Sequence, residues 1–174
     1  MKISKGGFTL IELLVVVAII GLLASIVLAS LNSARSKSGD AAVKSNLANI
    51  RAQSALIYSN SGCYGDGTPI TDTTCAPFTL GPCLNTTDNS IFKNPIVWAQ
   101  ISAAKSAAGG FASCMSTGSA WSVGIQMKEK PDAEAWCVDS NGTSKKESFV
   151  SSPPQSQGSL DMLITDLSGA AKCD

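Results

Sequence analysis

One acidic residue stands inside an otherwise uncharged apolar stretch near the N-terminus. Between Phe8 and Leu31 the only charged residue is Glu12. A carboxylate within a membrane-spanning helix costs on the order of 2.5–3.5 kcal/mol, so such acids usually have a partner and a function. Glu12 is therefore the first candidate functional residue, and it argues against the simpler interpretation of a plain membrane anchor.

A partner for Glu12 arises if the chain is cut between Gly7 and Phe8. The cut gives Phe8 a free α-amino group, about one helical turn from Glu12. Within one subunit, an acid near a helix N-terminus suits the helix dipole. Between subunits, a buried unpaired charge is costly, so an incoming α-amino group that pairs with a neighbour's Glu12 favours a single axial stagger. This reasoning predicts an assembly role for Glu12.

The residues around this junction resemble the N-terminal signature of type IV pilins and type II secretion pseudopilins. Gly-Phe-Thr-Leu-Ile-Glu at residues 7–12 follows a short basic leader with Lys2 and Lys5, and precedes an apolar run containing Gly21. The resemblance is confined to the leader and this run. It implies that a prepilin peptidase cleaves after Gly7, that Phe8 becomes the N-methylated N-terminus, and that Glu12 serves assembly.

One feature departs from the pattern of that family. Many members carry a proline further along this helix, near which the helix loosens when the filament forms. This chain has Ala29 in that region, and its first proline is Pro69. Gly21 and Gly39 remain as weak points, because glycine lowers helix propensity by about 1 kcal/mol. The missing proline argues against local melting.

The apolar run is long enough to cross a membrane. Its 24 residues, 8–31, would span roughly 36 Å as a helix, against about 30 Å for a hydrocarbon core. It exceeds the apolar region of a secretory signal peptide, which has about 7–15 residues. We expect Lys2 and Lys5 to stay cytoplasmic, which places the C-terminal domain outside. The predicted localisation is a single-pass cell membrane protein that later joins an extracellular pilus.

After the apolar run the pattern becomes amphipathic. Alternating spacings of four and three residues predict one buried helical stripe, formed by Val43, Leu47, Ile50, Ser54 and Ile57. Most of the charged residues between 35 and 51, including Asp40, fall off this stripe. We predict one continuous helix over residues 8–58, with a transmembrane or filament-core half (8–31) and an amphipathic half (32–58).

The remaining residues, 59–174, are expected to form a globular head. Residues 62–94 read as loop. Asn94 and Pro95 suit a helix start, and Gly109 a helix stop, which predicts a short helix over 95–108. Alternation around Trp121 and the turn signals that follow predict an antiparallel sheet over about 120–150. Helical spacing from Leu160 to Leu167 suggests a short helix in the C-terminal tail. The predicted fold class is therefore α+β, with the long helix packed on a small sheet and loops joined by disulfides.

Six cysteines follow the apolar run, and the chain has no histidine and no CxxC pair. An even number of cysteines in a loop-rich domain outside a membrane indicates disulfides rather than a zinc site. Six cysteines allow 15 pairings. Our first choices are Cys137–Cys173, Cys83–Cys114 and Cys63–Cys75.

Several kinds of chemistry are excluded or disfavoured by the residues present. Without histidine there is no Ser-His-Asp or Cys-His machinery, and no glycine-rich phosphate loop occurs. Asp139-Ser-Asn-Gly could form half of a calcium loop, but a turn fits better because no further carboxylate follows at regular spacing. The formal charge is zero, which indicates no nucleic-acid partner. We expect no enzyme activity, cofactor or metal.

The leading hypothesis is a structural subunit of a type IV pilus, used for adhesion, motility or DNA uptake. The resemblance implies these partners: other copies of the chain, a prepilin peptidase, an assembly platform with an ATPase motor, and the inner membrane before assembly. The alternatives are a pseudopilin of a type II secretion system and a membrane-anchored binding domain that never polymerises.

Overall fold

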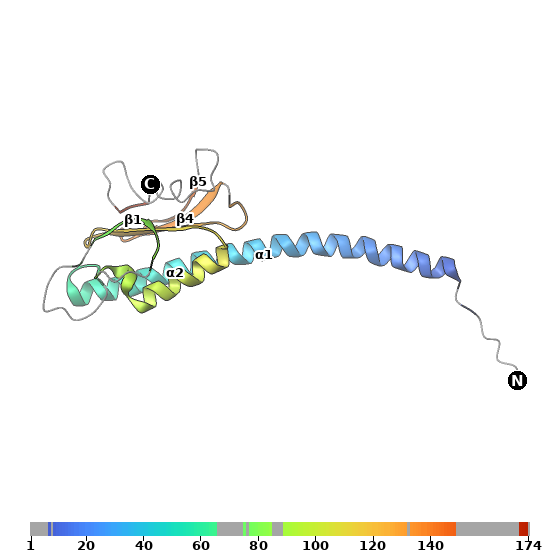
Figure 1. The fold of residues 1–174 in the computed structure, drawn as a ribbon, viewed down its shortest axis with the longest axis horizontal. Coiled ribbons are helices and arrows are strands. Elements are labelled where there is room, and N and C mark those ends of the chain that lie inside the picture. The colour runs from blue at the N-terminus through green and yellow to red at the C-terminus, as the bar shows by residue number, and fades with distance from the viewer. Residues whose placement is uncertain are drawn as a thin grey trace, which may run out of the picture. The chain divides into compact units, whose positions relative to one another are not determined.

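The computed structural model describes residues 7, 9–65, 75, 77–84, 89–131, 133–148 and 171–173. The chain divides into two compact units, Met1–Arg35 and Ser36–Asp174, here called the N-terminal and C-terminal units. Figure 1 shows the elements along the chain. They are α1 (Leu10–Ser61), β1 (Phe78–Pro82), η1 (Ile91–Lys93), α2 (Pro95–Ala108), β2 (Ala112–Ser116), β3 (Trp121–Gln126), β4 (Glu134–Asp139) and β5 (Ser144–Ser148).

The described part of the N-terminal unit consists of Gly7, Thr9 and the first half of helix α1. Its large apolar side chains are exposed on every side, from Leu10 at 87% to Leu31 at 49%. Among the described residues, α1 is the one helix that is long and apolar enough to cross a membrane. It continues without interruption through Gly21 and Gly39.

The C-terminal unit is built on a five-stranded antiparallel sheet in the order β1-β2-β3-β4-β5. The second half of α1, together with α2, covers one face of this sheet (Figure 1). α1 turns its apolar stripe inward, and Val43, Leu47 and Ile50 are fully buried. These side chains join one core with Ile101 of α2 and Trp121 of β3. The fold class is thus α+β, as predicted.

Helix α2 begins and ends where its sequence signals lie. The Asn94 side chain accepts hydrogen bonds from the backbone N–H groups of Ile96 (3.0 Å) and Val97 (3.2 Å), and proline occupies the first turn. At the other end Gly109 has a φ of 73°, and its N–H donates to the carbonyl of Lys105. Because glycine adopts this left-handed conformation without strain, it terminates the helix. The helix covers residues 95–108, the range expected from the sequence.

The sheet is larger than the sequence analysis expected. Residues 62–94 were predicted to be loop, yet β1 lies there, and β2 precedes the predicted range of 120–150. Neither strand has a sustained alternation: in β1 (FTLGP) it covers three residues before Gly-Pro, and β2 reads ASCMS. Their order comes from pairing across the sheet, which a local pattern does not reveal. The helix suggested between Leu160 and Leu167 lies outside the described residues.

Candidate functional site

Glu12 and Thr9 bond to each other at the first turn of α1. The Thr9 backbone N–H and hydroxyl donate to Oε2 of Glu12 at 2.9 Å and 2.8 Å, and the Glu12 N–H donates to Oγ1 of Thr9 at 3.3 Å. Because the helix begins at Leu10, Thr9 is the N-cap and Glu12 is the third helical residue. This reciprocal arrangement is a capping box, which satisfies backbone donors that a helix start leaves open.

The capping box leaves the carboxylate of Glu12 accessible. All of its hydrogen bonds to described residues use Oε2, so Oε1 remains available to another donor. The residue is exposed, as are the apolar side chains around it. An acid that is satisfied within its own chain and still open to a cation can change partners when a second molecule arrives.

Gly7 is exposed and lies just before the start of the helix. A Cβ added to Gly7 would meet nothing within 4 Å. The described part of the chain therefore gives no steric reason for glycine at this position. Phe8, the other side of the predicted cleavage, lies outside the described residues.

One of the two serines in the exposed part of α1, Ser25, has its hydroxyl satisfied within the helix. The Ser25 hydroxyl donates to the carbonyl of Gly21 at 2.9 Å. A Cβ added to Gly21 would meet nothing within 4 Å. Apart from Glu12 and the small hydroxyl of Ser30, the surface from Leu10 to Leu31 is apolar and thus compatible with burial in lipid or between other helices, since a helix that is apolar all round requires burial.

Polar contacts fix the second half of α1 to the sheet. The buried carboxylate of Asp40 accepts the backbone N–H groups of Lys128 (2.5 Å) and Glu129 (3.3 Å). Nη2 of Arg51 donates to the carbonyl of Thr143. Sequence reasoning placed Asp40 off the buried stripe, and the structure corrects this: the acid is 6% exposed because a turn from the sheet covers it.

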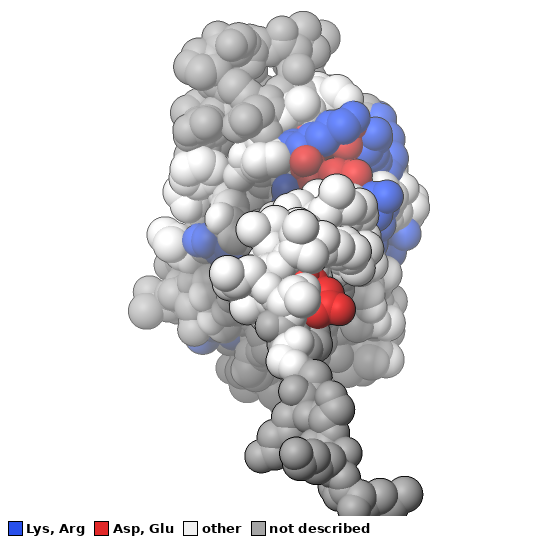
Figure 2. Space-filling view, turned by 90° about the vertical axis from the view of Figure 1, so that its right-hand side faces the viewer, with Lys and Arg blue, Asp and Glu red and all other residues white. Residues whose placement is uncertain are grey.

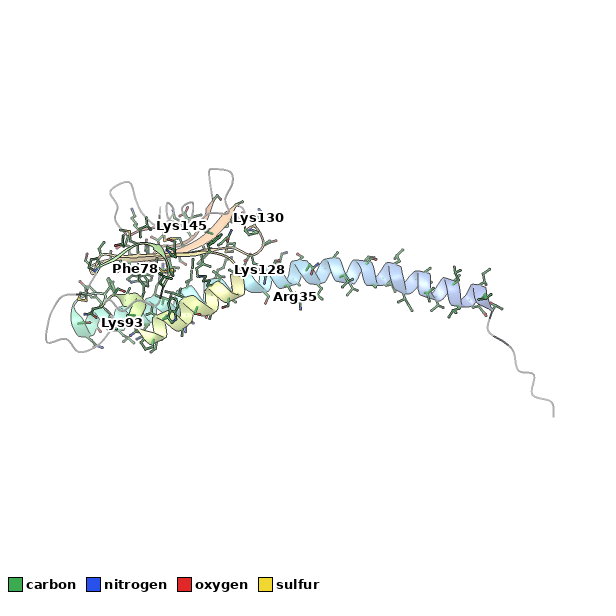
Figure 3. The ribbon with its side chains drawn as sticks, viewed as in Figure 1. Arg35, Phe78, Lys93, Lys128, Lys130 and Lys145 are labelled. Carbon is green, nitrogen blue, oxygen red and sulfur yellow. A yellow bond between two sulfur atoms is a disulfide. The ribbon has the colours of Figure 1, made fainter. Side chains whose placement is uncertain are left out.

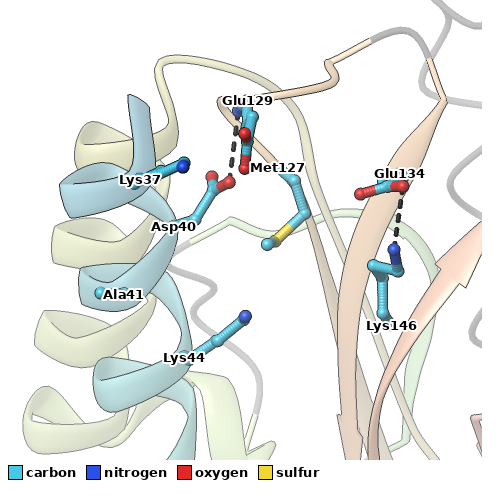
Figure 4. A pocket seen from close by; sticks show the side chains of 8 residues that line it. All are labelled: Lys37, Asp40, Ala41, Lys44, Met127, Glu129, Glu134 and Lys146. Atoms are coloured by element: carbon cyan, nitrogen blue, oxygen red, sulfur yellow. Dashed lines mark hydrogen bonds and ion pairs between the residues drawn. The ribbon is translucent and has the colours of Figure 1, made fainter. Parts of the chain in front are cut away.

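A groove with charged walls opens beside this contact, with a volume of about 290 Å³ (Figure 4). Its lining includes three basic and three acidic side chains, and consists of Lys37, Asp40, Ala41, Lys44, Met127, Glu129, Glu134 and Lys146. The Lys44 ammonium lies 4.7 Å from the ring centroid of Trp136, which is a cation–π contact.

The acids of the groove are largely engaged by groups of their own chain. Asp40 holds two backbone N–H groups, and Oε1 of Glu134 accepts from Lys146 at 2.9 Å and Lys130 at 3.2 Å. The hydrogen bond from Lys146 is the main reason why the pKa of Glu134 lies below its ordinary value. Within the described residues no cluster of three or more His, Cys, Asp or Glu side chains could hold a metal ion.

Three disulfides join the loops of the C-terminal unit. Cys63 pairs with Cys75, Cys83 with Cys114, and Cys137 with Cys173, which are the pairs chosen from the sequence. The second bond links the end of β1 to β2, which sequence reasoning had not recognised as strands. The third ties the C-terminal residues to β4.

The fully buried carboxylate of Asp139 supports the third disulfide. Its Oδ1 accepts the N–H groups of Asn141 (3.0 Å) and Thr143 (2.9 Å), and its Oδ2 accepts the N–H of Cys173 (3.1 Å). The segment Asp139-Ser-Asn-Gly is therefore a turn whose acid is occupied by backbone donors. The turn was favoured over a calcium loop from the sequence, but the role of Asp139 as an anchor for the C-terminus was not recognised.

Comparison with protein families finds one match. Residues 3–28 match the prokaryotic N-terminal methylation motif, which includes Gly7, Thr9 and Glu12. No curated protein and no solved structure matches the chain. The matched range contains the capping box and most of the exposed apolar helix. The chain thus carries the prepilin-type N-terminal signature of type IV pilins and pseudopilins.

Proposed function

We propose that this chain is a structural subunit of a type IV pilus that polymerises through its N-terminal helix. The observation that carries the proposal is Glu12: the single charge of an exposed apolar helix, placed five residues after the Gly7 junction and already engaged by Thr9. An apolar helix with one accessible acid suits repeated packing in one register, because any other stagger leaves the acid buried without a cation.

Maturation would proceed in two steps on the same residues. A prepilin peptidase cuts between Gly7 and Phe8, removing the leader 1–7, and Phe8 is N-methylated. Phe8 directly precedes Thr9 of the capping box in the sequence, so the cut creates the new α-amino group one residue before the helix cap, and this group would pair with Glu12 of a neighbour. Thr9 holds the acid in place until then, so that Glu12 is not left unpaired in the membrane.

The parts of the chain would then have separate roles. Residues 8–31 form the membrane anchor and later the filament core, residues 32–58 connect this core to the head, and residues 59–174 form the outer surface. Before assembly the protein is a single-pass inner-membrane protein with its C-terminal unit outside. An assembly platform and an ATPase motor extract it, and the finished filament serves adhesion, motility or DNA uptake.

A pseudopilin of a type II secretion system is the second candidate, because its class carries the same N-terminal motif. A direct test follows mature protein by intact-mass measurement and filaments by electron microscopy. We expect an N-terminus at Phe8 carrying one methyl group, and long surface fibres. An N-terminus at Met1 would exclude both candidates in favour of a plain anchored domain, and processed protein confined to short periplasmic fibres would leave only the pseudopilin.

A further inference from the structure

We propose that a cluster of lysines at one end of the C-terminal unit docks this unit on anionic phospholipid headgroups before assembly. The cluster, called here the end lysines, consists of Lys37, Lys105, Lys128 and Lys130. The inference rests on the proposed membrane-anchored precursor, and it adds a lipid partner that the N-terminal motif does not specify.

The end lysines come from three elements that meet at Gly39 of α1. A Cβ added to Gly39 would lie 2.9 Å from the carbonyl of Ala107 at the end of α2, and 2.8 Å from Cδ of Lys128 in the turn after β3. Lys105 belongs to the last turn of α2, and Lys37 lies two residues before Gly39. Lys130 follows in the same turn as Lys128. Lysines that lie up to 93 residues apart in the sequence are thus brought together at one end of the unit.

All four end lysines are exposed. Lys130 binds Glu134 at 3.2 Å, while Lys37, Lys105 and Lys128 form no ion pair with any described residue. Figure 2 shows basic side chains gathered on this side of the molecule with acidic ones among them. Figure 3 shows Lys128 and Lys130 at one end of the sheet and Lys93 near the other end.

The acids at this end offset the lysines only in part. The Asp40 carboxylate is buried and holds two backbone N–H groups, and Glu134 is shared between Lys130 and Lys146. Glu129 is the exposed acid of the turn among the described residues. Asp132 belongs to the same stretch of sequence and lies outside the described residues. Within the described residues, three end lysines without an ion-pair partner are therefore balanced by one exposed carboxylate, that of Glu129.

One of the end lysines, Lys37, follows the apolar run closely in the sequence. Six residues of α1 separate Leu31, the end of the apolar run, from Lys37, which is a rise of about 9 Å along a helix. This is comparable with the screening length of about 8–10 Å at physiological salt, within which lysines are attracted to anionic lipids. Long lysine side chains extend their ammonium groups toward such headgroups while their stems pack on protein, as that of Lys128 does on Gly39.

The test uses the full chain, one copy per lipid nanodisc, so that contacts between subunits are absent. An amine-reactive label followed by mass spectrometry reports the reactivity of each lysine. We expect the end lysines to be protected in discs containing about one third phosphatidylglycerol and reactive in discs of phosphatidylcholine alone, with protection lost at about 0.5 M NaCl. Lys93 is the internal control, because it lies away from this end, and its reactivity should stay constant.

A charge-removing variant makes the test quantitative. In Lys37→Gln/Lys128→Gln, protection of Lys105 and Lys130 should fall about fivefold for each lysine removed. The matched control Lys93→Gln/Lys172→Gln removes the same charge elsewhere and should leave protection unchanged. Equal protection in both kinds of disc, or no protection in either, overturns the proposal. Neither result affects the pilus function, which depends on processing and fibre formation.

Discussion

Glu12 and Thr9 form a closed pair at the start of α1, with the acid accepting both the backbone N–H and the hydroxyl of Thr9 within 2.9 Å. The acid that we propose serves assembly is therefore already part of the chain's own helix cap. In the proposed assembly, the α-amino group of a neighbour either displaces the donors of Thr9 or binds Glu12 beside them. The contributions of the two residues can be measured separately, because Glu12 carries the charge and Thr9 donates the hydrogen bonds that hold it.

Removing the charge of Glu12 should uncouple cleavage from assembly. In Glu12→Ala, we expect the leader to be removed normally, because the cut lies outside the helix, while filament yield falls at least tenfold. The reason is that no register is favoured over another once the acid is absent. Intact mass measures cleavage, and sheared-fibre protein measures assembly. Glu12→Asp, which keeps the charge on a shorter side chain, should retain part of the yield, and normal fibre yield from Glu12→Ala would refute the register argument.

Replacing Thr9 should weaken the helix start while the charge remains. Thr9→Val keeps the shape of the side chain and loses the hydroxyl, so we expect the first turn of α1 to open more often, by about 1 kcal/mol. Hydrogen exchange of the amides of residues 10–13 in detergent micelles measures this opening. Thr9→Ser retains the cap and should exchange like the natural protein. Equal protection in the valine variant would show that the hydroxyl of Thr9 contributes nothing to the helix start.

The N-terminal site and the helices could be predicted from sequence because their signals are local. Glu12 stands alone in an apolar run, and the caps of α2, Asn94 and Gly109, are read directly from residue types. The buried stripe of Val43, Leu47 and Ile50 follows from helical spacing alone. Each of these features depends on residues within a few positions of one another.

The features that could not be predicted depend on residues far apart in sequence. β1 and β2 lack a sustained alternating pattern and are defined by their pairing, for example Cys114 opposite Val123. Asp40 and Asp139 look like ordinary surface acids, yet each is buried by backbone donors from another segment, Lys128 for the first and Cys173 for the second. No local signal distinguishes an acid that folding will cover from one that stays in water.

Replacing Gly39 should destabilise the C-terminal unit, although glycine is unfavourable inside a helix. Gly39→Ala raises helix propensity by about 1 kcal/mol, but the new Cβ would lie 2.9 Å from the carbonyl oxygen of Ala107, a backbone atom that cannot move aside freely. Overpacking of this kind costs about 1–3 kcal/mol, so we expect net destabilisation of the C-terminal unit in denaturant unfolding. The control is Gly21→Ala, which meets open space and should leave that transition unchanged. A more stable Gly39→Ala protein would contradict the close contact of α1 with α2.

Replacing Asp139 should lower the stability of the C-terminal unit more than replacing an exposed acid in another turn. In Asp139→Asn one oxygen becomes an NH₂ group, which faces an N–H donor whichever way the amide is turned, because both oxygens accept hydrogen bonds. A buried donor without an acceptor costs about 1–3 kcal/mol. Denaturant unfolding with the disulfides intact measures this loss, and Glu129→Gln is the exposed control, which we expect to change little. Equal stabilities of the two variants would mean that the Asp139 carboxylate does not anchor Cys173.

The pair of lysines on Glu134 should give the C-terminal unit a small acid sensitivity. The hydrogen bond from Lys146, with that from Lys130, holds the pKa of Glu134 below its ordinary value of 4.5. A carboxyl whose folded pKa is depressed stabilises the fold above the unfolded pKa, and this contribution is lost as the pH falls from that value through the folded pKa. We therefore expect Glu134→Gln to be less stable than the natural protein at pH 6, and the difference to vanish at pH values below the folded pKa.

Because both lysines that bind Glu134 are exposed, this difference in stability should also shrink in 0.5 M NaCl. Thermal unfolding at each pH and salt concentration measures it. Lys145→Gln, which removes the neighbouring ion pair with Glu147 at 2.9 Å, is the matched control and should leave the contribution of Glu134 in place. A stability difference that persists unchanged into strong acid would show that Glu134 acts through packing rather than through its charge.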